Sequence, residues 1–307
     1  MTNSVPNQGV VGLTKVDIVQ GLHQIGLKTG DVVLVHAAMR TLGYVNGGAE
    51  TVVNALLEVI GKRGTLVVPT FTSAHYAAEH PIVDPENDPS EMGIISQTVK
   101  MHPGALKSTN WSHSFAVIGR RAQVITQVDP ALTVFDLRSA FGVMLALNTH
   151  ILLMGVPYQS STSHHLAEYV CDVPYRHTVD RGLVKVRRKD GSIVLQKMTD
   201  YTPRPGEREP DFNRLGSMLE NQGSVSITAI GNAVVRRYTM RDLIDLAQTE
   251  AEKDYNIFLT PKDNPHYSTA LQFGKTVIGP EMLDSGGWPL SAGWCVVDES
   301  KLVMPDV

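Results

Sequence analysis

The strongest constraint on the fold is the order strand, helix, strand between residues 32 and 68. Residues 32–36 and 65–68 are short apolar runs rich in β-branched side chains, which predicts two buried strands. Residues 49–60 between them have apolar side chains at helical spacing. Strands joined by a helix pair in parallel and need helices above the sheet. We therefore expect an α/β fold with a mixed, largely parallel central sheet and covering helices.

The composition indicates a large globular chain without a nucleic-acid or membrane partner. The 307 residues, 42% of them hydrophobic, are enough for one large core. The net charge of −4 gives no basic footprint for nucleic acid, and no apolar run approaches the roughly 20 residues that span a bilayer. The two cysteines do not suggest a disulfide framework, and the N-terminus has no secretory signal pattern. We expect a cytoplasmic protein.

A second strand-to-helix junction carries the candidate catalytic residues. Residues 150–156 form an apolar run that predicts a strand, and the hydroxyl residues that follow can cap a helix. With Thr162 as the cap, His165 is the third helical residue and shares a face with Glu168. A histidine oriented by a carboxylate can act as a general base, and open α/β sheets bind ligands at such junctions. The alternative is an ordinary helix start with an exposed histidine and a surface glutamate.

Other chemistries have weaker support in the sequence. The chain has neither the Gly-x-Ser-x-Gly turn of many hydrolases nor a phosphate-binding P-loop, and residues 43–48 lack the dinucleotide-binding glycine spacing. A zinc motif is incomplete because Tyr169 follows Glu168. His164, His165 and Glu168 as ligands together with a distant further group remain a less favoured alternative, a metal-dependent hydrolase. We therefore expect no metal.

Two further stretches have a distinctive texture. Residues 70–89 are polar, proline-marked and longer than most loops, which favours a lid or binding loop over an idle surface loop. Carboxylates gather in and beside this stretch and would suit a polycationic ligand, although such runs are usually only solvated. Near residues 170–200 the pattern changes, and Asp190-Gly191 between the strand-like runs 183–188 and 193–197 predicts a hairpin. The clustered carboxylates are Glu79, Asp84, Glu86, Asp88 and Glu91.

Several blocks together resemble the aminoglycoside 3-N-acetyltransferase family, the antibiotic N-acetyltransferases. The resemblance covers roughly residues 13–260 and implies an α/β fold distinct from the common small acetyltransferase fold. It implies acetyl-CoA as donor and an amine of an aminoglycoside, the 3-amino group of 2-deoxystreptamine, as the polycationic acceptor. We expect residues 1–260 to form this domain, with two interlocked lobes as an alternative, and residues 261–307 to form an extension of unknown role. The matching blocks are residues 36–53, 64–72, 92–96, 107–108, 114–116, 152–168 and 231–233.

The resemblance also implies roles for individual residues. His165 and Glu168 look like the base and its orienting carboxylate in a direct transfer, and Asn110 joins them as a catalytic candidate. The implied acceptor contacts are Tyr76, Glu91, Glu168 and Asp172. The implied contacts with coenzyme A are His36, Ala37, Ala38, Met39, Thr70, Phe71, Thr72, Lys107, Ser108 and Ser114.

Departures from the family pattern leave alternatives open. Ala37 and Ala38 stand where the family usually has hydroxyl residues, so two side-chain hydrogen bonds to coenzyme A are missing. Trp111 follows Asn110 where the family often has a proline, and Ala140 also replaces a usual proline. The alternatives are a catalytically degenerate protein that only binds coenzyme A, or an acetyltransferase for a different amine. The sequence leaves open whether the chain forms a homodimer.

Overall fold

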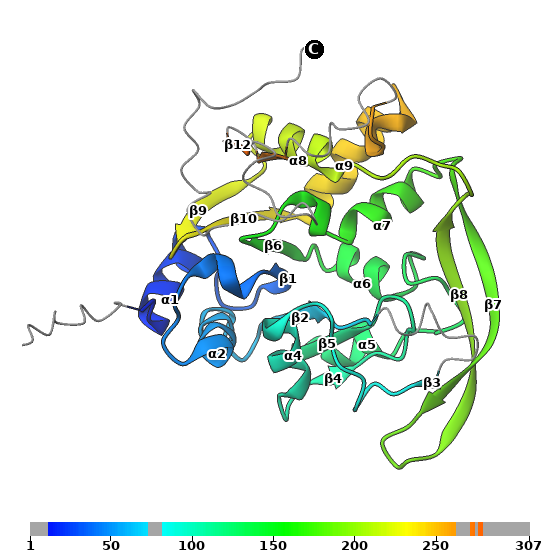
Figure 1. Ribbon diagram of the computed structural model, residues 1–307, viewed down its shortest axis with the longest axis horizontal. Coiled ribbons are helices and arrows are strands. Elements are labelled where there is room, and N and C mark those ends of the chain that lie inside the picture. Colours follow the sequence, from blue (N-terminus) through cyan, green and yellow to red (C-terminus); the bar gives the residue numbers. More distant parts are fainter. Residues whose placement is uncertain (1–11, 73–81, 262–270, 274–275, 279–307) are drawn as a thin grey trace, which may run out of the picture.

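The computed structural model describes residues 12–72, 82–261, 271–273 and 276–278. Its centre is a seven-stranded sheet with the strand order β4-β5-β2-β1-β6-β10-β9 (Figure 1). The residue order of these strands differs from their order in the sheet, so the chain crosses over between neighbours. The strands are β1 (Val32–Ala37), β2 (Thr65–Pro69), β4 (Leu106–Lys107), β5 (Phe115–Gly119), β6 (His150–Met154), β9 (Ser226–Ile230) and β10 (Ala233–Thr239).

The sheet is mixed, as expected, but less parallel than expected. β1 pairs in parallel with both β2 and β6, which confirms the strand-helix-strand prediction. The outer strands β5, β4, β10 and β9 all join by antiparallel pairing. On one side β9 and β10 form a hairpin around Gly231, and such short connections permit only antiparallel pairing. Within this sheet, parallel pairing is thus confined to the three central strands.

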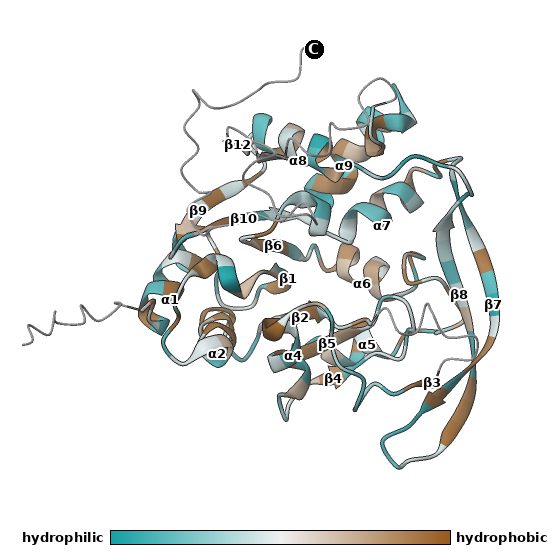
Figure 2. Cartoon of the chain, in the orientation of Figure 1, coloured by the Kyte–Doolittle hydropathy of each residue, from teal (hydrophilic) through white to brown (hydrophobic). Residues whose placement is uncertain are grey.

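Helices cover both faces of the sheet because the side chains of each central strand alternate between two cores. Val33 and Val35 pack into one core, and Leu34 packs into the other. Figure 2 shows hydrophobic residues concentrated in the central strands and in α2. The first core is covered by α1 (Lys15–Gln24), α2 (Gly48–Ile60) and α4 (Ile94–Met101). The second is covered by α5 (Ala122–Thr126), α6 (Ala140–Ala146), α7 (Ser163–Val170), α8 (Phe212–Asn221) and α9 (Met240–Ala251).

A second, three-stranded sheet stands beside the main one and follows the change of texture in the sequence. It consists of β3 (Ile82–Val83), β7 (Arg176–Arg187) and β8 (Ile193–Pro203). β7 and β8 form the hairpin predicted around Asp190-Gly191, but their strands are longer than the sequence indicated (Figure 1). The remaining elements are η1 (Met39–Leu42), η2 (Tyr158–Ser160), η3 (Tyr255–Phe258), β11 (Leu271–Phe273) and β12 (Thr276–Ile278).

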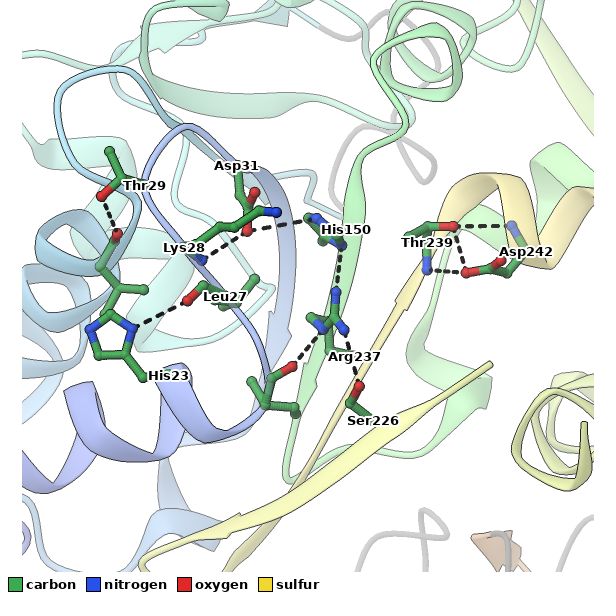
Figure 3. Close-up of polar contacts among 12 residues, drawn as sticks. His23, Leu27, Lys28, Thr29, Asp31, His150, Ser226, Arg237, Thr239 and Asp242 are labelled. Atoms are coloured by element: carbon green, nitrogen blue, oxygen red, sulfur yellow. Dashed lines mark hydrogen bonds and ion pairs between the residues drawn. The ribbon is translucent and has the colours of Figure 1, made fainter. Parts of the chain in front are cut away.

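A polar cluster ties the strands together at the end of the sheet where β1 and β6 begin (Figure 3). Arg237 donates hydrogen bonds to the Ile25 carbonyl at 2.6 Å, to Ser226 Oγ at 3.0 Å and to His150 Nδ1 at 3.1 Å. Burial is the main cause that lowers the pKa of His150. The bond that Nδ1 accepts from Arg237 also favours the neutral ring. His150 Nε2 lies 3.7 Å from Asp31. This cluster leaves the opposite end of the strands for the site.

Gly155 connects β6 to the segment that leads into α7, and its conformation should be intolerant of a side chain. Its φ is +67°, and an added Cβ would lie 1.8 Å from Thr41 Oγ1. We expect Gly155→Ala to lower the free energy of unfolding by about 3 kcal/mol, because backbone strain and overpacking add. Gly191→Ala is the control, since Gly191 has φ +85° with no atom within 4 Å of the added Cβ. Equal losses for both variants in urea unfolding would contradict the packing argument.

Candidate active site

The predicted dyad at the start of α7 is formed in the structure. Thr162 is the N-cap residue, and His165 is the third residue of α7, as the sequence indicated. His165 Nδ1 lies 2.5 Å from Glu168 Oε2, so the two side chains share a helical face and form a hydrogen bond. The Thr162 hydroxyl makes no capping bond. The helix start therefore depends on the packing of α7 and not on its cap.

Glu168 is a fully buried carboxylate with three donors around it. It receives bonds from His165 and, at 3.1 Å, from the Tyr175 hydroxyl to Oε1. Arg176 Nε lies 3.0 Å from Oε2. Tyr175 and Arg176 were not predicted, because the sequence placed the start of the hairpin near residue 183. Their only sequence signal is their position after Pro174, a few residues beyond the end of the helix. A buried carboxylate needs such partners to remain ionised.

The His165 ring is oriented as a general base requires. Because Nδ1 faces a carboxylate, Nδ1 carries the proton, and in the neutral form of the ring Nε2 has the free lone pair that a base needs. No described residue makes a hydrogen bond to Nε2. The ring is packed edge-on against Phe212, Phe135 and His113, with centroid distances of 4.9, 5.8 and 6.4 Å. The side chain keeps 18% of its surface exposed, so it is both fixed and accessible.

His165 and Glu168 line a cavity of about 420 Å³. Its other wall is the loop from Pro203 to Pro210, which joins β8 to α8. This loop brings charged side chains of both signs to the cavity, and Arg208 is tied down by the Thr260 carbonyl and Asn256. A volume of this size is within the range of small-molecule sites. The charged residues of the loop are Arg204, Glu207, Arg208 and Glu209.

A second cavity, of about 540 Å³, lies where β1 and β2 end. It is lined by four of the residues expected to contact coenzyme A, together with Glu91, Val156 and Ser160. Its position at the carboxyl ends of parallel strands is where α/β sheets bind ligands. His36 Nε2 is buried and makes no hydrogen bond to any described residue, so a ligand can still use it. The four expected residues are His36, Ala37, Ala38 and Met39.

The other residues expected to contact coenzyme A are not brought into this cavity. Lys107 pairs with Glu86, Ser108 Oγ accepts from the Phe115 amide at 2.8 Å, and Phe71 packs on the His113 ring. These hydroxyl and lysine residues surround an interior space of about 10 Å³, which is large enough for a water molecule but not for a nucleotide. Residues in this space are Thr70, Thr72, Lys107, Ser108 and Ser114.

The residues expected to contact the acceptor are scattered. Tyr76 lies outside the described residues. Glu91 accepts a bond from Thr72 Oγ1 at 2.7 Å and lines the 540 Å³ cavity, which His165 does not line. Asp172 is exposed just beyond α7 and lines neither cavity. Only Glu168 of this group lies beside His165.

The acidic stretch does not form the free anionic surface that its composition indicated. Asp84 lies 3.1 Å from Arg187 Nε, and Glu86 pairs with Lys107. Asp84 thus ties the end of β3 to β7, and Glu86 ties the loop after β3 to β4. Since both carboxylates are matched by cations, they contribute little field toward a polycation. Glu79 lies outside the described residues.

Asn110 organises a loop, and among the described residues its side chain makes no hydrogen bond to His165. Its Oδ1 accepts from the backbone amides of Ser112 at 2.9 Å and His113 at 2.8 Å. His113 Nδ1 in turn lies 3.0 Å from Ser112 Oγ, and its ring packs on Phe135 at 5.1 Å. Asn110 therefore places the His113 ring beside His165, a neighbour that sequence reasoning had missed.

Buried histidines should make the protein acid-sensitive. Burial lowers the pKa of His36 to about 4 and is the main cause that lowers those of His113 and His164 to about 3. Between pH 6.5 and 4 these histidines bind protons in the unfolded chain but stay neutral in the folded protein. The free energy of unfolding therefore falls as the pH falls. Burial raises the pKa of Asp211 to about 6, which offsets one proton in this range. We expect unfolding free energy to drop on the order of 4 kcal/mol from pH 7 to 5.

The measurement is urea unfolding across this pH range. His164→Gln should reduce the slope of unfolding free energy against pH by about one proton, because it removes one histidine that is neutral in the folded protein and protonated in the unfolded chain. A flat pH dependence in the unmodified protein would contradict the assignment of these rings as buried and neutral.

The described residues give no support for a metal enzyme or a membrane-spanning protein. No three of their His, Cys, Asp or Glu side chains come together as a metal site, and His164 is fully buried, stacked on Phe212 at 4.8 Å. Within the same residues, no helix has the length and apolarity to cross a membrane. The metal-hydrolase alternative therefore gains no ligand set from the structure.

The chain is similar to known proteins over most of its length. A model of the family described as aminoglycoside 3-N-acetyltransferase matches residues 34–252. The chain is 27% identical over 255 residues to the SPbeta prophage-derived aminoglycoside N(3')-acetyltransferase-like protein YokD of Bacillus subtilis, covering 76% of this chain and 91% of that protein.

Solved structures share the fold. A mutant of aminoglycoside acetyltransferase AAC(3)-IVa in complex with a gentamicin is 25% identical to this chain, with a TM-score of 0.68. The match covers 83% of this chain and 95% of that chain. AAC-IIIb in a binary complex with CoASH is 21% identical, with a TM-score of 0.68, covering 81% and 98%. This fold is distinct from the common small acetyltransferase fold, as expected. With its family match over most of the chain, the protein belongs to the aminoglycoside 3-N-acetyltransferase family of enzymes.

Proposed function

We propose that the protein transfers the acetyl group of acetyl-CoA directly to the 3-amino group of an aminoglycoside, with His165 as the general base. The observation that carries this proposal is the bond between His165 Nδ1 and the buried Glu168, which leaves Nε2 able to take a proton. The cavity of about 420 Å³ beside the ring gives room for part of an acceptor. The names of the relatives supply the substrate class.

The proposed reaction balances without a further reagent. His165 Nε2 takes a proton from the acceptor amine as its nitrogen attacks the thioester carbonyl carbon. The carbon–sulfur bond then breaks, and the leaving thiolate of coenzyme A takes up that proton to give the thiol. Glu168 holds the ring in one tautomer and stabilises the cation that forms on it. The products are the acetylated amine and free coenzyme A.

The cavity at the ends of β1 and β2 is the proposed donor site. His36 Nε2 is a buried atom without a described partner there, and it suits a ligand that brings hydrogen-bonding groups. A structural neighbour, AAC-IIIb, was solved with CoASH, which supports this choice of donor. Ala37 and Ala38 offer no hydroxyls, so this chain would hold coenzyme A with fewer side-chain bonds.

These two alanines also favour a second candidate, a protein that binds coenzyme A without turnover. A thiol-release assay with acetyl-CoA and a panel of aminoglycosides and simple amines separates the two. We expect thiol release that depends on an aminoglycoside. Thermal stabilisation by coenzyme A without thiol release would instead indicate the binding protein. Release with simple amines alone would indicate a different acceptor. EDTA should leave the rate unchanged, and loss of activity that zinc restores would favour the metal alternative.

A further inference from the structure

Arg176, the first residue of β7, contacts the same oxygen of Glu168 that His165 uses. Its Nε lies 3.0 Å from Glu168 Oε2, and His165 Nδ1 lies 2.5 Å from that atom. Arg176 and Glu168 are almost removed from water, with 9% and 1% of their side-chain surfaces exposed. The sequence resemblance gave Arg176 no role, and the proposed mechanism does not use it.

The guanidinium is itself held in place from β8. Arg176 Nη1 donates to the Tyr201 carbonyl at 3.1 Å, and its central carbon lies 5.3 Å from the centre of the Tyr201 ring. Tyr175 next to it donates to the other carboxylate oxygen. The hairpin therefore fixes both oxygens of Glu168 from the side opposite α7. An arginine fixed in this way acts as a permanent counter-charge.

A buried carboxylate without this counter-charge has two ways to lower its energy. It can take up a proton, and the bond that orients His165 is then no longer charge-assisted and is weaker. It can also hold a proton on the His165 ring as an imidazolium partner, and the ring is then no longer a base. Both responses impair the base, and both are reversed when the pH is raised.

We infer that Arg176 is a positioning residue that keeps Glu168 ionised and oriented, so that His165 stays a neutral base until it takes the acceptor's proton. This inference rests on the proposed function of His165. It predicts that Arg176 acts on the pH dependence of the reaction and not on substrate contact.

The test has to separate this trio from the other titratable groups around the dyad. Burial chiefly lowers the pKa values of His113 and His164 to about 3 and raises that of Cys171 to about 11. Burial likewise raises the pKa values of Tyr175 and Tyr201. Asp211, next to Phe212, has a pKa of about 6, but a change at Arg176 does not touch it. The remaining charged groups nearby are Asp136 with Arg138, Asp172, and Arg204, Glu207, Arg208 and Glu209 on the cavity loop.

The test compares Arg176→Gln, Arg176→Lys and the unmodified protein. We expect the acid limb of the kcat/KM profile to move up by about one pH unit or more in Arg176→Gln. Arg176→Lys retains the charge, so its acid limb should lie at the same pH as in the unmodified protein. Its kcat should fall by about tenfold, because lysine cannot bond Glu168 and the Tyr201 carbonyl as the planar guanidinium does. Arg181→Gln is the matched control. Arg181 lies on β7 like Arg176, but it pairs with Asp200 of β8 at 3.1 Å, outside the site.

A second readout does not depend on turnover. The histidine NMR signal that disappears in His165→Gln should titrate at higher pH in Arg176→Gln than in the unmodified protein. If no amine is acetylated, the proposed function fails and this titration still tests Arg176. A folded Arg176→Gln protein with unchanged acid limb and titration would overturn the inference. If Arg176→Gln does not fold, a shifted acid limb in Arg176→Lys would overturn it, and an unshifted limb with lower kcat would support it.

Discussion

Replacing His165 with glutamine should lower kcat about a thousandfold, because general base catalysis contributes about 10²- to 10⁴-fold. Without Nε2 the acceptor amine must lose its proton to water. The ring is partly exposed and makes one hydrogen bond to a side chain, so the fold should survive the change. The measurement is steady-state thiol release at saturating acetyl-CoA, together with thermal unfolding.

The controls for His165→Gln are the binding and stability of the variant. KM for acetyl-CoA should change little, since His36 and its neighbours line a cavity that His165 does not line. If a folded variant keeps near-normal kcat, the acceptor amine does not need this base, and the dyad is a structural feature of α7.

Replacing Glu168 with glutamine should impair both activity and stability. The amide cannot compensate the Arg176 charge, and breaking a buried pair in this way costs about 3–5 kcal/mol. The activity should fall by about 10²- to 10⁴-fold, because the ring loses the partner that fixes its tautomer. Urea unfolding measures the first effect, and thiol release under conditions where the variant is folded measures the second.

A double variant separates the two effects of Glu168→Gln. Glu168→Gln with Arg176→Gln removes both buried charges, so much of the lost stability should return, while activity should stay low. Equal stability of the single and double variants would contradict a buried, charge-compensated Glu168. Full activity in either variant would contradict the orienting role of the carboxylate.

Local patterns predicted the parts of this protein that depend on neighbours in the chain. The spacing of His165 and Glu168 fixes their contact because residues three apart meet on a helix. The apolar run of β1 and the helix that follows it likewise led to the parallel centre of the sheet. The hairpin turn at Asp190-Gly191 was also visible in the sequence.

Contacts between distant elements could not be read in this way. Arg176 meets Glu168 only because the chain turns back after α7 and brings the first residue of β7 to the helix, and the strand start was placed too late to show it. β10 was missed, and with it the antiparallel side of the sheet. The charge of Asp84 and Glu86 was visible, but their pairing with Arg187 and Lys107 depends on tertiary packing. Composition alone therefore overstated the anionic surface.

The most direct test of the proposed reaction is the structure of the product. An aminoglycoside is incubated with acetyl-CoA and the purified protein, and the product is examined by mass spectrometry and NMR. The proposed function predicts one added acetyl group on the 3-amino nitrogen of the 2-deoxystreptamine ring, formed by the unmodified protein and almost absent with His165→Gln. An unchanged aminoglycoside, or an acetyl group formed equally well without His165, would contradict it.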